Sequence, residues 1–153
     1  MFRSSKTIIP TGPWFHKTSD IEFKKKAFIH LGSLEQAKMR SGLVSKRILV
    51  FQLIPGLTFF RMRDKGSWNT ENLKRMTSRY DGIVYLNRFE GIPLNEFDQC
   101  KNEPDELSDN CFRKHMPSAS DSIIVFNPIN IKFVGEYDIE DKIEHIVQEE
   151  MHP

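Results

Sequence analysis

We expect this chain of 153 residues to fold as a single α+β domain spanning residues 1–153. Its length lies within the ordinary range of one domain. Hydrophobic residues make up 39% of the chain and aromatic residues 11%, which is enough for a packed core. Short β-favouring runs and short helical segments follow one another without regular βαβ alternation, and this order favours α+β over α/β.

The first half of the chain predicts four strands and two helices. Residues 1–12 lack periodicity and predict a loose lead-in. A helix over 34–40 begins with the capping-box pair Ser33 and Gln36, and a second helix over 71–78 is capped by Thr70. Strands are expected where aromatic and β-branched residues gather before turn-forming residues, at 14–16, 27–31, 47–54 and 57–62.

The second half predicts three further strands, at 83–87, 122–126 and 129–134. Residues 91–121 contain three prolines, seven acidic side chains and few aliphatic ones, which predicts a long acidic loop insertion. Such a loop in a compact domain is commonly functional, and the alternative is a disordered, solvated segment. Over residues 138–150 the aliphatic side chains recur at helical spacing, which predicts a terminal amphipathic helix.

The net charge of +1 conceals a separation of charge along the chain. Residues 1–90 carry 17 basic and 7 acidic side chains, a net charge of +10, whereas residues 91–153 carry 5 and 14, a net charge of −9. A basic surface attracts polyanions, so nucleic acid is one expected partner. The alternative is that the acidic half neutralises the basic half within the fold, because charges separated in sequence can be close in space.

Other classes of site find little support in the sequence. No apolar run approaches the ~20 residues of a membrane span and no secretory signal is evident, so we expect no membrane partner and a cytoplasmic location. Cys100 and Cys111 are separated by ten intervening residues, a spacing that matches no tight chelating loop, so we expect no metal. The P-loop, dinucleotide-binding, zinc-protease and nucleophile-elbow motifs are absent from the sequence.

Four segments stand out when they are taken together. They read FHKTS at 15–19, FIHLGSLEQA at 28–37, YDGIVYLNRFEG at 80–91 and SIIVFNPINIK at 122–132. This series resembles the ADP-ribosyltransferase domains of bacterial toxins and phage polyvalent proteins. That family has a strand ending in His-Gly-Thr, a turn into a Gln-Ala helix, a YDGIVYxNxxE segment and a strand similar to SYIVFxPxQIK. The resemblance covers residues 14–134 and is most specific in the last two segments.

The resemblance implies split antiparallel β-sheets flanked by short helices, with a cleft that binds NAD. It implies a mono-ADP-ribosyltransferase, which transfers ADP-ribose from NAD to a macromolecular acceptor, a protein or a nucleic acid, and releases nicotinamide. Its relatives act as toxins and in phage conflict, which adds phage defence and toxin–antitoxin systems to the expected roles. An antitoxin or inhibitor protein is therefore a further expected partner.

The resemblance also implies NAD-binding side chains. His16 would hydrogen-bond the adenosine ribose, and Thr18 or the backbone beside it would hold the nicotinamide amide. Lys17 stands where the family has glycine, and its ammonium would meet the pyrophosphate. Tyr85 or Phe28 would stack on the nicotinamide ring.

Three more side chains are assigned to the same cleft. His30 lies on the second strand and either lines the cleft or packs in the core. Asn87 shares one strand face with Tyr85, so both would touch NAD if that face is the cleft, and Tyr85 is a core residue if it is not. Ser122 opens the strand at 122–126. Trp14 and Trp68 are expected to be packing residues.

Catalysis in this family needs a carboxylate that stabilises the oxocarbenium-like charge as the glycosidic bond breaks. Many transferases place a Glu at the start of the strand that corresponds to 122–126, where this chain has Asp121. Glu90 in the YxNxxE segment is the preferred catalytic residue and Asp121 the reserve. The alternative for Glu90 is a surface ion pair with Arg88. The second hypothesis for function, supported by Lys17 and the missing strand-initial Glu, is a catalytically silent ADP-ribosyltransferase-like module that binds nucleic acid or protein.

Overall fold

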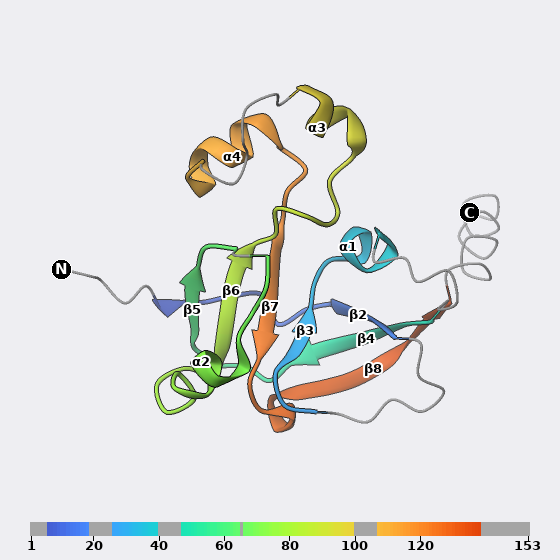
Figure 1. Ribbon diagram of the computed structural model, residues 1–153. Helices are drawn as coiled ribbons and strands as arrows, with labels where there is room; N and C mark the ends of the chain where they lie inside the picture. The colour runs from blue at the N-terminus through green and yellow to red at the C-terminus, as the bar shows by residue number, and fades with distance from the viewer. Residues whose placement is uncertain (1–5, 19–25, 40–46, 65, 100–106, 139–153) are drawn as a thin grey trace.

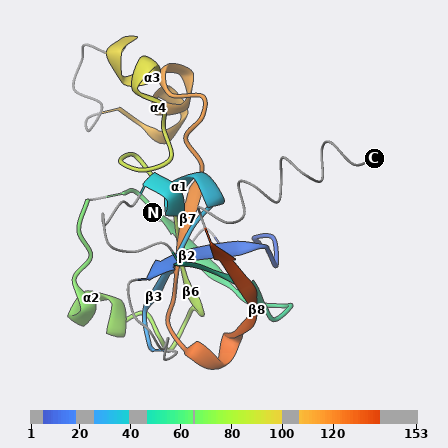
Figure 2. The ribbon, with the colours of Figure 1, turned by 90° about the vertical axis from the view of Figure 1, so that its right-hand side faces the viewer.

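The computed structural model describes residues 6–18, 26–39, 47–64, 66–99 and 107–138. They form an α+β structure with two small β-sheets and a few short helices, as the sequence predicts (Figure 1). Strands of the smaller sheet cross those of the larger sheet, and helices α3 and α4 stand beyond one end of the larger sheet (Figures 1 and 2). No helix within these residues is long and apolar enough to cross a membrane.

The larger sheet has five strands, in the order β1 (Lys6–Thr7), β5 (Phe59–Met62), β6 (Gly82–Leu86), β7 (Asp121–Val125) and β3 (Ile29–Leu31). Two expectations are corrected here. Residues 6–7, expected within a loose lead-in, pair with β5. The sheet is not wholly antiparallel, because β5 and β6 run parallel, joined by a connection that contains helix α2 (Thr70–Lys74).

The smaller sheet is antiparallel and consists of β2 (Trp14–Thr18), β4 (Arg47–Leu53) and β8 (Ile131–Asp138). Strand β4 is the central one and buries Ile48, Leu49 and Phe51, which confirms the expected buried strand. Strand β8 runs four residues further than expected and ends at Asp138. The expected terminal helix over 138–150 is therefore wrong at residue 138, and its remainder, 139–150, lies outside the described residues.

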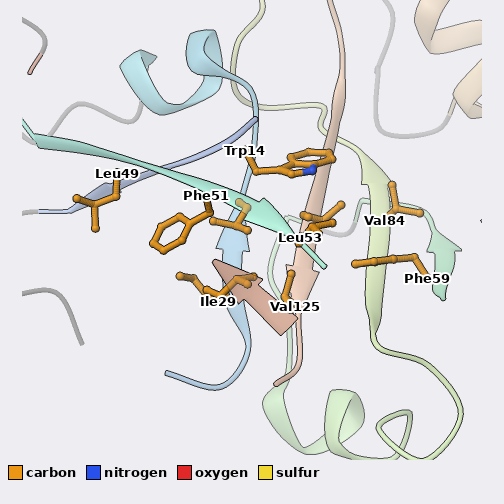
Figure 3. Packing of buried hydrophobic residues seen from close by; sticks show 11 residues of the cluster. Trp14, Ile29, Leu49, Phe51, Leu53, Phe59, Val84 and Val125 are labelled. Carbon is orange, nitrogen blue, oxygen red and sulfur yellow. The ribbon is translucent and has the colours of Figure 1, made fainter. Parts of the chain in front are cut away.

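The main hydrophobic core lies between the two sheets (Figure 3). Leu49 and Phe51 of the smaller sheet and Ile29 and Val125 of the larger belong to one buried cluster. Trp14 is 7% exposed in this cluster and its indole N–H donates to Pro10 O at 2.9 Å, so its expected packing role is confirmed. Burial of these side chains from both sheets fixes how the sheets meet, and the cavity described below lies at that junction.

The two helices expected in the first half are present. Helix α1 (Leu34–Met39) has the predicted capping box: Gln36 N donates to Ser33 Oγ at 3.1 Å, and Ser33 N donates to Gln36 Oε1 at 3.0 Å. Helix α2 is shorter than expected and is capped by Asn69 instead of Thr70. The Asn69 Oδ1 accepts from Glu71 N at 2.9 Å, and an amide oxygen is a strong cap acceptor.

The expectation of a long loop over 91–121 is wrong in part. This stretch contains helices α3 (Leu94–Gln99) and α4 (Asp109–His115), which lie side by side beyond the end of β6 and the start of β7 (Figures 1 and 2). Phe112 and Met116 are buried with Leu86 and Ile92 in a small cluster of their own. Arg88 covers this cluster, with its guanidinium 4.6 Å from the Phe112 ring centre. Burial of a few apolar residues therefore stabilises helical structure in a segment that has seven acidic side chains and few aliphatic ones.

Candidate functional site

A cavity of about 390 Å³ lies where the two sheets meet. The junction is made by the backbones of Phe15 in β2 and Gly32 after β3, which exchange hydrogen bonds of 2.8 and 2.9 Å. The cavity wall also includes residues of α1, Asp64, residues 66–68, and residues at the end of β6 and the start of β7. A cavity of this size, built from several segments, is typical of a small-molecule site.

Most of the side chains chosen from the sequence line this one cavity. They come from positions up to 106 residues apart, and they are His16, Lys17, His30, Tyr85, Asn87, Glu90 and Ser122. Thr18 and Asp121 do not line it. The sequence therefore identified much of the wall of one cavity from four separate segments.

His16 and His30 lie on neighbouring strands at the cavity. The Nδ1 of His16 lies 2.8 Å from the backbone oxygen of His30. Because a carbonyl oxygen only accepts, Nδ1 carries a proton and donates this bond. This bond fixes the orientation of His16. Both histidines are half-buried at the cavity, so the alternative of a core position for His30 does not describe it.

Glu90 is half-buried at the cavity and is held by Asn87. The Asn87 Oδ1 accepts from the backbone N–H groups of Phe89 and Glu90, both at 2.9 Å, which forms a tight turn just after β6. The Asn87 Nδ2 donates to Glu90 Oε1 at 3.0 Å. One asparagine therefore fixes both the backbone and the carboxylate of Glu90.

Asn87 and Ser122 are wall residues with their polar atoms engaged inside the protein. Asn87 is 3% exposed, and its second Nδ2 hydrogen bond goes to Ser122 Oγ at 3.0 Å. Ser122 is 4% exposed and donates to Gln36 Oε1 at 2.6 Å. The sequence assigns both residues to the NAD-binding cleft; both line the cavity, and these hydrogen bonds link them to Glu90 and to Gln36.

Tyr85 and Trp68 form an aromatic wall of the cavity. Their ring centres are 4.8 Å apart and their planes are inclined by 46°. Tyr85 is 6% exposed, so it is a core residue with one edge at the cavity, and Trp68 is half-buried beside it. The sequence interpretation missed Trp68 as a cavity residue. Phe28, the other stacking candidate, lies away from this cavity against Phe126 at 5.5 Å.

Asp64 is a further residue that sequence reasoning missed. Its side chain is 8% exposed, and it accepts from Gly66 N and Arg88 N, both at 2.9 Å. These bonds attach the loop that carries Trp68 to the segment that carries Glu90. Phe89 is 53% exposed at the cavity rim and lies next to Gly66. The sequence signal was a turn-forming Asp two residues before Gly66, which shows a turn but not its long-range partner.

Asp121, the reserve catalytic residue, is held by arginines away from the cavity. Arg61 donates to its two carboxylate oxygens at 2.9 and 2.7 Å, and Arg113 lies 3.5 Å away. The hydrogen bonds that Arg61 donates to Asp121 raise the pKa of the Arg61 guanidinium above its ordinary value. Thr18 is 7% exposed at the end of β2 and also lies outside the cavity.

The Arg88 side chain donates to Asp109 Oδ1 at 2.8 Å, at the start of α4, and to Leu107 O at 2.7 Å, just before α4.

Among the described residues, no group of three or more His, Cys, Asp or Glu side chains could hold a metal ion. Comparisons with protein-family models, with curated proteins and with solved structures gave no match to this chain.

Proposed function

We propose that the protein is a mono-ADP-ribosyltransferase that uses NAD as co-substrate and modifies a macromolecular acceptor. The observation that carries the proposal is that His16, Tyr85 and Glu90 share the wall of one cavity. A histidine, an aromatic ring and an oriented carboxylate are the parts that cleavage of the nicotinamide glycosidic bond requires. The four sequence segments that resemble the family supply all three.

The reaction breaks the bond between the ribose C1′ and the nicotinamide nitrogen. The bonding electron pair leaves with nicotinamide, and positive charge develops on the ribose ring. The Glu90 carboxylate, held by Asn87, would hydrogen-bond the ribose 2′-hydroxyl and stabilise this charge. A nucleophilic oxygen or nitrogen of the acceptor then bonds to C1′ and loses its proton. With water as the acceptor, the same site is an NAD glycohydrolase.

The remaining wall residues fit parts of NAD. The His16 ring would hydrogen-bond a ribose hydroxyl, and the Lys17 ammonium would meet the pyrophosphate. Tyr85 and Trp68 offer aromatic surface for the nicotinamide ring. Phe89, exposed at the rim of the cavity, would contact the acceptor. A toxin of this kind would have a cognate antitoxin or inhibitor protein. An inhibitor that covers the cavity rim would block the site.

A catalytically silent module that binds nucleic acid or protein is the second candidate. Lys17 at a position where the resembled family has glycine favours it, because a side chain there narrows the approach to the ligand. The net charge of +10 over residues 1–90 favours nucleic acid as the ligand of such a module.

Incubation with NAD labelled in the adenosine part, with and without cell lysate, separates the candidates. The transferase predicts free nicotinamide and labelled macromolecules, and digestion with protease or nuclease identifies the class of acceptor. Free nicotinamide without labelled macromolecules indicates glycohydrolysis. Absence of both products, together with retention of the protein on RNA, would support the silent module instead.

A further inference from the structure

We infer that Gln36 is a positioning residue of the active site, which holds Glu90 in place through Ser122 and Asn87. The catalytic part of this inference rests on the proposed function. The structural part, a hydrogen-bond chain from α1 to the turn at Glu90, does not. The sequence assigned Gln36 only to the capping box of α1.

Every hydrogen-bonding position of the Gln36 amide is used inside the protein. Gln36 is 3% exposed. Its Nε2 donates to the backbone oxygen and to the Oγ of Ser120, at 3.0 and 2.9 Å. Its Oε1 accepts from Ser33 N at 3.0 Å and from Ser122 Oγ at 2.6 Å. A capping box needs only the bond to Ser33, so three of these four bonds serve another purpose.

The direction of each bond carries the effect of Gln36 to Glu90. The Ser122 hydroxyl has one proton, and it is committed to Gln36 Oε1. The Ser122 oxygen is thereby left as an acceptor for Asn87 Nδ2, at 3.0 Å. The other Nδ2 proton of Asn87 then points to Glu90 Oε1, also at 3.0 Å. Without the Gln36 acceptor, the Ser122 hydroxyl loses the bond that fixes its rotamer, and its oxygen is no longer held toward Asn87 Nδ2.

Two glycines show how closely the backbone approaches Gln36. A Cβ at Gly32 would overlap Gln36 Oε1. A Cβ at Gly91, directly after Glu90, would lie 2.7 Å from Gln36 Cγ, closer than side-chain carbons pack. Gln36 is therefore packed against both the junction of the sheets and the turn that carries Glu90.

The test uses the full chain with Gln36→Met, which keeps the length and volume of the side chain and removes its hydrogen bonds. Gln52→Met is the matched control, because Gln52 is exposed on β4 and does not line the cavity. We expect Gln36→Met to lower kcat for nicotinamide release about 5- to 10-fold, while the KM for NAD changes less than about twofold. The control should match the unmodified protein in both constants.

A double-mutant cycle distinguishes positioning from general destabilisation. In a Glu90→Ala background, Gln36→Met should lower the residual rate by less than about twofold, because no carboxylate remains to be positioned. The same 5- to 10-fold fall in rate in the Glu90→Ala background would overturn the inference. An effect of Gln36→Met on the KM for NAD alone would do so as well. If Gln36→Met does not fold, Ser122→Ala breaks the same chain with the loss of one oxygen, and the same expectations apply.

Hydrogen exchange of the Asn87 side-chain amide, followed by NMR, tests the chain without NAD. We expect Gln36→Met to raise this exchange rate at least tenfold over that of the unmodified protein, and Gln52→Met to leave it unchanged. Unchanged exchange in a folded Gln36→Met protein would overturn the inference even if NAD is cleaved. A protein that shows this exchange pattern but cleaves no NAD would refute the proposed function and leave the Gln36 chain standing.

Discussion

Gly91→Ala places a methyl group into the contact between Gln36 and the turn that carries Glu90. Gly91 has a φ of +78°, a conformation that costs an alanine about 1–2 kcal/mol. The new Cβ would also lie 2.7 Å from Gln36 Cγ. Because Gln36 is held by four hydrogen bonds, it cannot move away freely, and overpacking of this kind costs about 1–3 kcal/mol. We therefore expect the unfolding free energy to fall by about 2–5 kcal/mol.

Gly56→Ala is the matched control, because Gly56 has a similar φ of +84° but no atom within 4 Å of the added Cβ. It carries the conformational cost alone, about 1–2 kcal/mol. Urea unfolding followed by circular dichroism measures the unfolding free energy of both variants. In thermal unfolding, the melting temperature should fall by about 2–4 °C for each kcal/mol lost. Equal losses in the two variants would refute the packing of Gly91 against Gln36. The packing would also be refuted if Gly91→Ala lowered the unfolding free energy equally in the unmodified protein and in the Gln36→Ala variant.

Three further results are expected. NAD should change the fluorescence of Trp68, which lines the cavity, so the change should persist in Trp14→Phe and disappear in Trp68→Phe; the opposite pattern would place the ligand elsewhere. Arg61→Met should lower the unfolding free energy by about 1 kcal/mol, because Asp121 loses the two hydrogen bonds that Arg61 donates. It should leave NAD cleavage unchanged; a loss of cleavage would indicate that Asp121 takes part in catalysis. Asn69→Ala should cost about 1 kcal/mol as a lost helix cap, measured by urea unfolding; no loss would reject the cap.

The strands were predictable where the sequence signal is local. The runs that became β4 and β7 are rich in β-branched and aliphatic residues, and such runs favour strands wherever they are buried. The parallel pairing of β5 with β6 was not predictable, because it depends on where the connection through α2 crosses the sheet. Helix α4 was missed because Phe112 is one of few apolar residues in it, and its burial depends on distant Leu86 and Ile92.

The cavity shows the same division between local and distant signals. Glu90 and His16 were chosen from short segments, and the structure brings both to one cavity. The role of Gln36 was only half predictable. Its bond to Ser33 is three residues away and visible as a sequence pattern, whereas Ser120 and Ser122 are 84 and 86 residues away. Only the tertiary structure reveals that the Gln36 side chain both caps helix α1 and bonds Ser120 and Ser122.

The release of nicotinamide by Glu90→Gln tests the central claim most directly. This change keeps the size of the side chain and an oxygen for Asn87, and removes the negative charge that would face the ribose. We expect kcat/KM to fall about 100- to 1000-fold, the size of effect typical of a lost electrostatic contact in the transition state. Glu71→Gln, on the exposed face of α2, should leave it unchanged. A Glu90→Gln protein that releases nicotinamide within a few-fold of the unmodified rate would contradict the account.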